Sequence, residues 1–222
     1  MATPNLSLAV AQGVRKVKPR LRGVSHQITF FVGLVGAAAL VRLAPPGAAT
    51  WAVGVYAASF LLLFGGSALY HRPTWSPRWR ARLQRVDHAA IFGLIAGTYT
   101  PIAVLAVPPD VGQRLLLMVW LGAGAGMALS VLWVKVPKAL MAALCVALGW
   151  IIVADWEAVR LGLGQPAAGL VVAGGALYTV GAVVYAARWP DPAPRVFGYH
   201  EVFHLFTIAA AGCHAVVVAG LL

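Results

Sequence analysis

Long apolar runs, separated by short polar segments, dominate this chain. Runs of about 20 mostly uncharged residues are long enough to cross a hydrocarbon core of about 30 Å as α-helix. A membrane β-barrel would instead show short segments of alternating hydrophobicity. The pattern predicts an all-α membrane protein, a bundle of seven transmembrane helices. The seven runs lie near residues 27–44, 50–70, 88–107, 115–134, 138–154, 167–187 and 200–221.

Composition supports a membrane protein. Of 222 residues, 61% are hydrophobic and only 10% are charged, more apolar surface than a soluble domain of this size could bury. Residues 1–25 are basic and contain no apolar stretch, so we expect a cytoplasmic tail rather than a cleaved secretory signal. The loops after it are short, so we expect residues 26–222 to form one seven-transmembrane domain.

The basic residues predict the orientation, because short cytoplasmic loops collect Lys and Arg. Fourteen of the seventeen lie on one side of the predicted spans, which places the N-terminus in the cytoplasm and the C-terminus outside. The net charge of +11 then indicates contact with membrane lipids, in particular anionic headgroups at the cytoplasmic loops, rather than with nucleic acid. The fourteen are Arg15, Lys16, Lys18, Arg20, Arg22, Arg72, Arg78, Arg80, Arg82, Arg85, Lys135, Lys138, Arg188 and Arg195.

Polar residues at the cytoplasmic ends of three spans predict a metal site. His71 closes the second span, Asp87 opens the third, and His200 and His204 open the seventh. A spacing of four places His200 and His204 on one helix face, about 6 Å apart, and places Ser67 one turn deeper than His71. Three imidazoles favour zinc, with the fourth tetrahedral position left for water as in catalytic sites. A single histidine at a helix end is more often an interfacial polar residue, but the combination favours metal binding.

The other histidines are weaker candidates. His26 precedes the first span, and we expect it at the membrane interface. His88 follows Asp87 directly and therefore points about 100° away from it on a helix. His214 lies about 15 Å beyond His204 along the helix, too far to share its metal, and we expect it to form a hydrogen bond within the bundle.

Small residues inside the apolar runs have structural interpretations. Cys145 and Cys213 belong to no Cys-x-x-Cys pair, and we expect free thiols rather than a disulfide. Gly122, Gly124 and Gly126 suit close packing of helices in lipid better than a phosphate-binding loop.

The motifs resemble the haemolysin III and progestin/adipoQ receptor family, which is distantly similar to alkaline ceramidases. The resemblance covers everything after the tail. It implies that His71, His200 and His204 bind zinc, and that Ser67 and Asp87 lie beside the water that completes its coordination. Without a large N-terminal domain, the chain resembles the bacterial branch, which is linked to haemolysis or membrane homeostasis and implies the cytoplasmic membrane. The matching stretches are Ser67-Ala-Leu-Tyr-His71, Asp87-His-Ala-Ala-Ile-Phe92, Gly97-Thr-Tyr-Thr-Pro101 and His200-Glu-Val-Phe-His204.

Four functions remain open at this point. The primary hypothesis is a zinc-dependent hydrolase of a lipid amide or ester, with Asp87 as the base. Its main rival is a zinc-stabilised membrane protein that senses or maintains the bilayer without catalysis. A haemolytic pore has little support in the chain. The segment from His200 to His204 also matches His-Glu-x-x-His, the pattern of zinc proteases, although that interpretation gives His71 and Ser67 no role and Glu201 can instead face the headgroups. Substrate and oligomeric state are not indicated.

Overall fold

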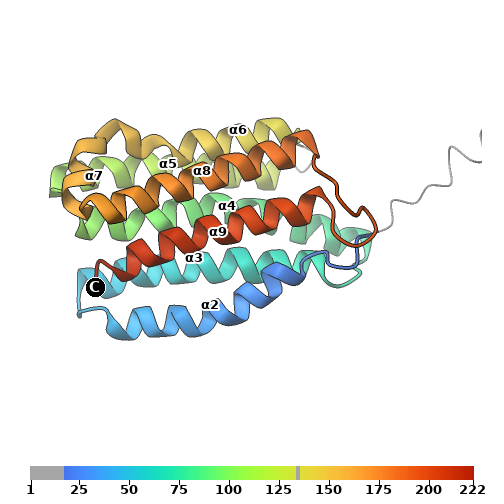
Figure 1. Cartoon of the computed structure of the whole chain (residues 1–222), viewed down its shortest axis with the longest axis horizontal. Helices are drawn as coiled ribbons and strands as arrows, with labels where there is room; N and C mark the ends of the chain where they lie inside the picture. The colour runs from blue at the N-terminus through green and yellow to red at the C-terminus, as the bar shows by residue number, and fades with distance from the viewer. Residues whose placement is uncertain (1–17, 134–135) are drawn as a thin grey trace, which may run out of the picture.

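The protein is all-helical, and its long apolar helices run side by side along one axis (Figure 1). The computed structural model describes residues 18–133 and 136–222, so most of the basic tail lies outside the described residues. Within these described ranges, seven helical segments are long and apolar enough to span a membrane, which indicates an integral membrane protein. The elements are α2 (Val24–Leu43), α3 (Ala48–His71), α4 (Pro77–Leu105), α5 (Pro109–Leu132), α6 (Lys138–Gly149), η1 (Ile151–Asp155), α7 (Trp156–Leu163), α8 (Gln165–Ala187) and α9 (Tyr199–Ala219).

The seven predicted spans are confirmed as long apolar helices, and the start of α4 is displaced furthest from its prediction. The helix expected from residue 88 begins at Pro77, so Asp87 lies well inside α4 rather than at its opening. Proline suits the first turn of a helix because its missing N–H needs no partner there. The basic residues between Pro77 and Asp87 are helical, but they are too polar to be recognised as part of an apolar run. The hydropathy pattern detects the membrane-spanning part of a helix and misses its polar extension.

The fifth span is interrupted. The α6 helix ends at Gly149, a 3-10 turn follows, and α7 continues to Leu163, so the span is longer than expected. The Tyr99 hydroxyl on α4 stabilises the break: it donates to the Gly149 carbonyl at 2.8 Å and accepts from the Ile152 N–H at 2.9 Å. Because lipid offers no hydrogen bonds, an irregular backbone at this depth needs such partners within the protein.

The α4 helix lies at the centre of the bundle and α2 lies at its edge. In α4, 61% of the most apolar stretch is buried, against 6% in α2. One apolar core joins α4 to α5, α6 and η1, with Phe92 and Leu115 at its centre. A second core joins α3 to α4 and α9, around Val53 and Phe64. The α3 and α9 helices therefore approach each other on one side of α4, which is where the candidate site lies.

Only part of the glycine interpretation is confirmed. A side chain at Gly126 would meet the Phe92 ring, and one at Gly122 would meet Leu148, so both glycines allow close packing against α5. Gly124, between them, faces open space.

Candidate metal centre

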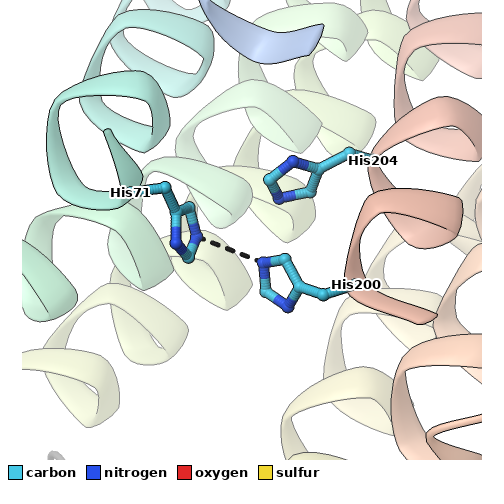
Figure 2. Close-up of side chains that lie close together, drawn as sticks. All are labelled: His71, His200 and His204. Carbon is cyan, nitrogen blue, oxygen red and sulfur yellow. Dashed lines mark hydrogen bonds between the residues drawn. The ribbon is translucent and has the colours of Figure 1, made fainter. Parts of the chain in front are cut away.

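Three histidines from two helices converge at one end of the bundle. His71 is the last residue of α3, and His200 and His204 occupy successive turns at the start of α9 (Figure 2). Their exposed fractions are 8%, 9% and 1%, respectively. The Nε2 atoms of His71 and His200 are 3.2 Å apart, and one ring nitrogen from each of the three histidines lies within 4.8 Å of the others.

This geometry fits one tetrahedral metal ion. Zinc bound to imidazole nitrogens at 2.0–2.1 Å separates two ligand nitrogens by about 3.3 Å, close to the distance between His71 and His200. Three neutral imidazoles from two helices could therefore share one cation after a small movement of His204. The set is composed of nitrogen donors, which suit zinc better than calcium or magnesium.

A carboxylate and a hydroxyl lie beside the three histidines. Asp87 Oδ2 on α4 is 3.6 Å from the Nε2 atom of His71. Ser67 lies one turn before His71 on α3 and neighbours the Asp87 carboxylate. Ser67 and Asp87 are both buried. The structure thus brings together all five residues that the sequence analysis selected, although Asp87 comes from a helix interior.

His26 also belongs to this region, and it is buried within the protein in the first turn of a span rather than placed before it. It lies in the first turn of α2 with an exposed fraction of 2%. Its ring stacks on that of His204, with centroids 3.6 Å apart and an angle of 12° between the planes. The sequence did contain a signal, because the predicted topology places His26 on the same side of the membrane as His71 and His200.

Glu201 is buried, so the expectation that it faces the headgroups is wrong. Only 2% of its side chain is exposed. One carboxylate oxygen accepts a hydrogen bond from the Arg22 guanidinium, and the other accepts from the Gly198 N–H at 2.8 Å. The second bond caps the first turn of α9, which carries His200. Both oxygens therefore have structural partners, which favours a structural role for Glu201 over that of a zinc-protease base.

The segment before α2 packs across this end of the bundle. Arg20 and Leu21 donate backbone hydrogen bonds to the loop before α9, at 3.1 and 3.0 Å. The Lys18 ammonium donates to the Arg72 carbonyl at 2.8 Å, just after His71. Burial, with Arg72, Arg80 and Arg22 nearby, lowers the pKa of Lys18 below its ordinary value. This segment therefore joins α3 and α9 beside the histidine cluster in a strongly basic environment.

An apolar cavity extends from the site into the bundle. Ser67, Asp87, His200 and His204 line one part of it, and His214 lines another, ten residues further along α9. That separation corresponds to about 15 Å along a helix. The walls come from α4, α6, α8 and α9, and include Leu94, Met141, Val146, Ala182 and Phe203. A cavity of this shape suits an extended hydrocarbon chain with a polar end at the histidines.

The remaining candidates are placed apart from the cluster. His88 lines the cavity and is half-buried. His214 forms the hydrogen bond expected of it, with its Nε2 atom 3.2 Å from the Val171 carbonyl oxygen. Cys145 and Cys213 are free thiols, as the sequence analysis predicted.

Comparison with known proteins places these features in a family. Residues 14–215 match the sequence profile of a family described as haemolysin-III related. The chain belongs to the haemolysin-III related family. A protein named Hemolysin-3 homolog from Bacillus subtilis (strain 168) is 27% identical over 191 residues, which cover 85% of this chain and 86% of that protein. Hemolysin-3 of Bacillus cereus is 31% identical over 159 residues, which cover 71% of this chain and 68% of that protein.

The haemolysin-III match includes every residue of the candidate centre. His26, Ser67, Asp87 and the three histidines of the cluster all lie between residues 14 and 215. The match therefore confirms the resemblance noted in the sequence, while the metal and the chemistry of the centre are inferred from its geometry.

Proposed function

We propose that this haemolysin-III family protein is a zinc-dependent hydrolase that cleaves an amide or ester bond of a membrane lipid. One observation carries the proposal: a buried carboxylate lies beside a three-histidine cluster at the polar end of an apolar cavity. Purely structural metal sites are usually closed by four protein ligands, whereas three ligands with an acid–base group beside them are typical of catalytic sites.

Each residue of the candidate centre has its own role in the proposed hydrolysis. Bound zinc would act as a Lewis acid that polarises the scissile carbonyl and lowers the pKa of water. Asp87 accepts a proton from the attacking water and passes it to the leaving amine or alcohol, because its carboxylate lies directly beside the cluster. Ser67, the neighbour of this carboxylate, would orient it by donating its hydroxyl proton in a hydrogen bond. The apolar walls around Leu94 and Phe203 hold the acyl chain and exclude bulk water.

The charge distribution supports activity at the cytoplasmic leaflet. The ends of α3 and α9 that carry the histidines are the ends flanked by basic loops, and such loops face the cytoplasm. We therefore place the N-terminus in the cytoplasm and the C-terminus outside. Anionic headgroups would contact the exposed arginines that follow α3 and begin α4, namely Arg72, Arg78, Arg80 and Arg82.

A second candidate function is a zinc-stabilised membrane protein without catalysis. It is favoured by the same pair of helices, because one metal would join α3 and α9 through residues 129 positions apart in the sequence. Structural metals stabilise a fold by cross-linking segments that are distant in the sequence. The pore suggested by the relatives' names has no such support. A zinc protease would need Glu201 as its base, but the Glu201 carboxylate accepts hydrogen bonds from Arg22 and from the Gly198 N–H.

The test is an Asp87→Asn variant purified with its zinc. We expect zinc content and thermal stability close to those of the wild type, and at least about a 10²-fold loss of turnover on the best substrate of a ceramide, N-acyl lipid and phospholipid panel. Asp110→Asn, at the opposite end of the bundle, is the matched control and keeps full turnover. Zinc-loaded wild type that cleaves no lipid of the panel would refute the hydrolase and leave the structural role.

A further inference from the structure

The peripheral helix α2 contributes one polar side chain to the interior, and it does so at the candidate metal centre. Of its 20 residues only His26 and Ala37 are buried. The rest of the helix exposes large apolar side chains such as Phe31, Val32 and Val35, as expected for a helix that faces lipid. A helix with so little contact with the bundle nevertheless inserts an imidazole beside the cluster.

Ring faces, rather than hydrogen bonds, hold His26 in place. Its ring lies flat on that of His204 and packs edge to face with that of Phe64, with ring centroids 4.9 Å apart and an angle of 80° between the planes. Both ring nitrogens are buried without a hydrogen-bond partner among the described residues. A backbone group of His204 lies close to the ring without reaching hydrogen-bond geometry. The position of His26 is therefore determined by its contact with the His204 ring.

His204 lacks the usual means of fixing a metal ligand. Metal-binding histidines almost always donate their second ring N–H to a carboxylate, a carbonyl or water, which sets the orientation of the ring. The Nδ1 atom of His204 is buried and has no partner in the described part of the chain. The stacked ring of His26 is the planar contact that can take over this role.

Contacts just before α2 fix the start of the helix and thereby keep the His26 ring against the His204 ring. Gly23, which precedes the helix, has a φ of 78° and lies so close to His71 that an added Cβ would be 2.7 Å from the His71 Cβ. Arg22 pairs with Glu201, which adjoins His200. Two residues just before His26 are thus fixed to both helices that carry the cluster.

We propose that His26 is a positioning residue that holds the metal ligand His204 in its binding orientation by stacking on its ring. It is not itself a ligand, because among the described residues the nitrogens close enough to share one ion belong to His71, His200 and His204. The inference rests on metal binding by these three histidines, as set out under the proposed function.

The experiment compares zinc affinity in three variants of the full-length protein, purified in detergent and measured by competition with a chromophoric chelator. His26→Ala and His26→Leu remove the flat ring, and we expect 10- to 100-fold weaker binding, the usual cost of losing a residue that orients a ligand. His26→Phe keeps a flat ring, and we expect affinity close to that of the wild type. It also removes two unpaired buried nitrogens, so its melting temperature should rise. Cobalt substituted for zinc should give a visible spectrum altered in His26→Leu and unchanged in His26→Phe.

His214→Leu is the matched control, because it removes a buried histidine of α9 that lies away from the cluster and should leave zinc affinity unchanged. The inference is wrong if His26→Leu binds zinc as tightly as the wild type. It is also wrong if His26→Phe loses as much affinity as His26→Leu, since the nitrogens would then matter rather than the ring face. Wild type that binds no zinc would instead refute the proposed function on which the inference rests.

Discussion

Arg22 and Glu201, 179 positions apart in the sequence, form a buried ion pair that joins the start of α2 to the first turn of α9. The carboxylate is almost completely buried, whereas 20% of the arginine side chain is exposed. The pair lies beside His200, so it connects the stability of the bundle to the candidate metal centre. Removing one member of a buried pair leaves the other charge uncompensated, which is strongly destabilising.

Arg22→Ala should therefore lower the free energy of unfolding by about 3–5 kcal/mol. Thermal unfolding of the purified protein measures this loss. Arg20→Ala is the control, because Arg20 is exposed and contributes its backbone N–H to the loop before α9. An Arg22→Ala protein as stable as Arg20→Ala would show that the pair does not hold the two helices together.

The α5 helix allows a test of close packing with neighbouring glycines. Gly126→Ala should destabilise the protein, because the new methyl group would collide with the Phe92 ring in the apolar core. We expect a loss of about 1–3 kcal/mol, typical of overpacking. Gly124→Ala, which places its methyl group in open space, should leave stability unchanged or raise it slightly through helix propensity. Equal melting temperatures for the two variants would contradict the packing of α5 on α4.

The Tyr99 hydroxyl contacts the backbone on both sides of the break between α6 and η1. Tyr99→Phe removes one hydrogen bond to the Gly149 carbonyl and one from the Ile152 N–H. Because buried backbone groups without partners cost about 1–3 kcal/mol each, we expect a clear drop in melting temperature. Zinc content should not change, since the break lies away from the histidine cluster. A stable Tyr99→Phe protein would mean that other groups satisfy the broken helix.

The membrane architecture was predictable from the sequence because length and hydropathy alone decide whether a helix can span a bilayer. The four-residue spacing of His200 and His204 likewise predicts their shared face on any helix. His71 could be added because the predicted topology brings it to the same side. These features follow from local periodicity and from charge counting, which require no knowledge of how the helices pack.

Contacts between helices were not predictable in the same way. Nothing in the spacing of His26 or Glu201 indicates which helix each will meet, so both were expected at the membrane surface and both are buried. The start of α4 was misplaced because polar helical residues carry no hydropathy signal. Tyr99 acquires its role only because a helix 50 residues away breaks beside it.

The orientation can be tested by labelling single cysteines in cells with a membrane-impermeant maleimide. In a variant without Cys145 and Cys213, Ser76→Cys precedes α4 and Gln165→Cys begins α8, and both positions are exposed. We expect Gln165→Cys to react in intact cells and Ser76→Cys to react only after permeabilisation, because the basic loops face the cytoplasm. The reverse pattern would place the histidine cluster at the outer leaflet.

The central claim is that one metal ion binds to His71, His200 and His204. Elemental analysis of the purified full-length protein tests it most directly, with His71→Ala as the decisive variant and His88→Ala as the matched control. The account predicts about one equivalent of zinc in the wild type and in His88→Ala, and far less than one equivalent in His71→Ala, which loses a ligand. Wild type without bound metal, or His71→Ala with a full equivalent, would contradict it.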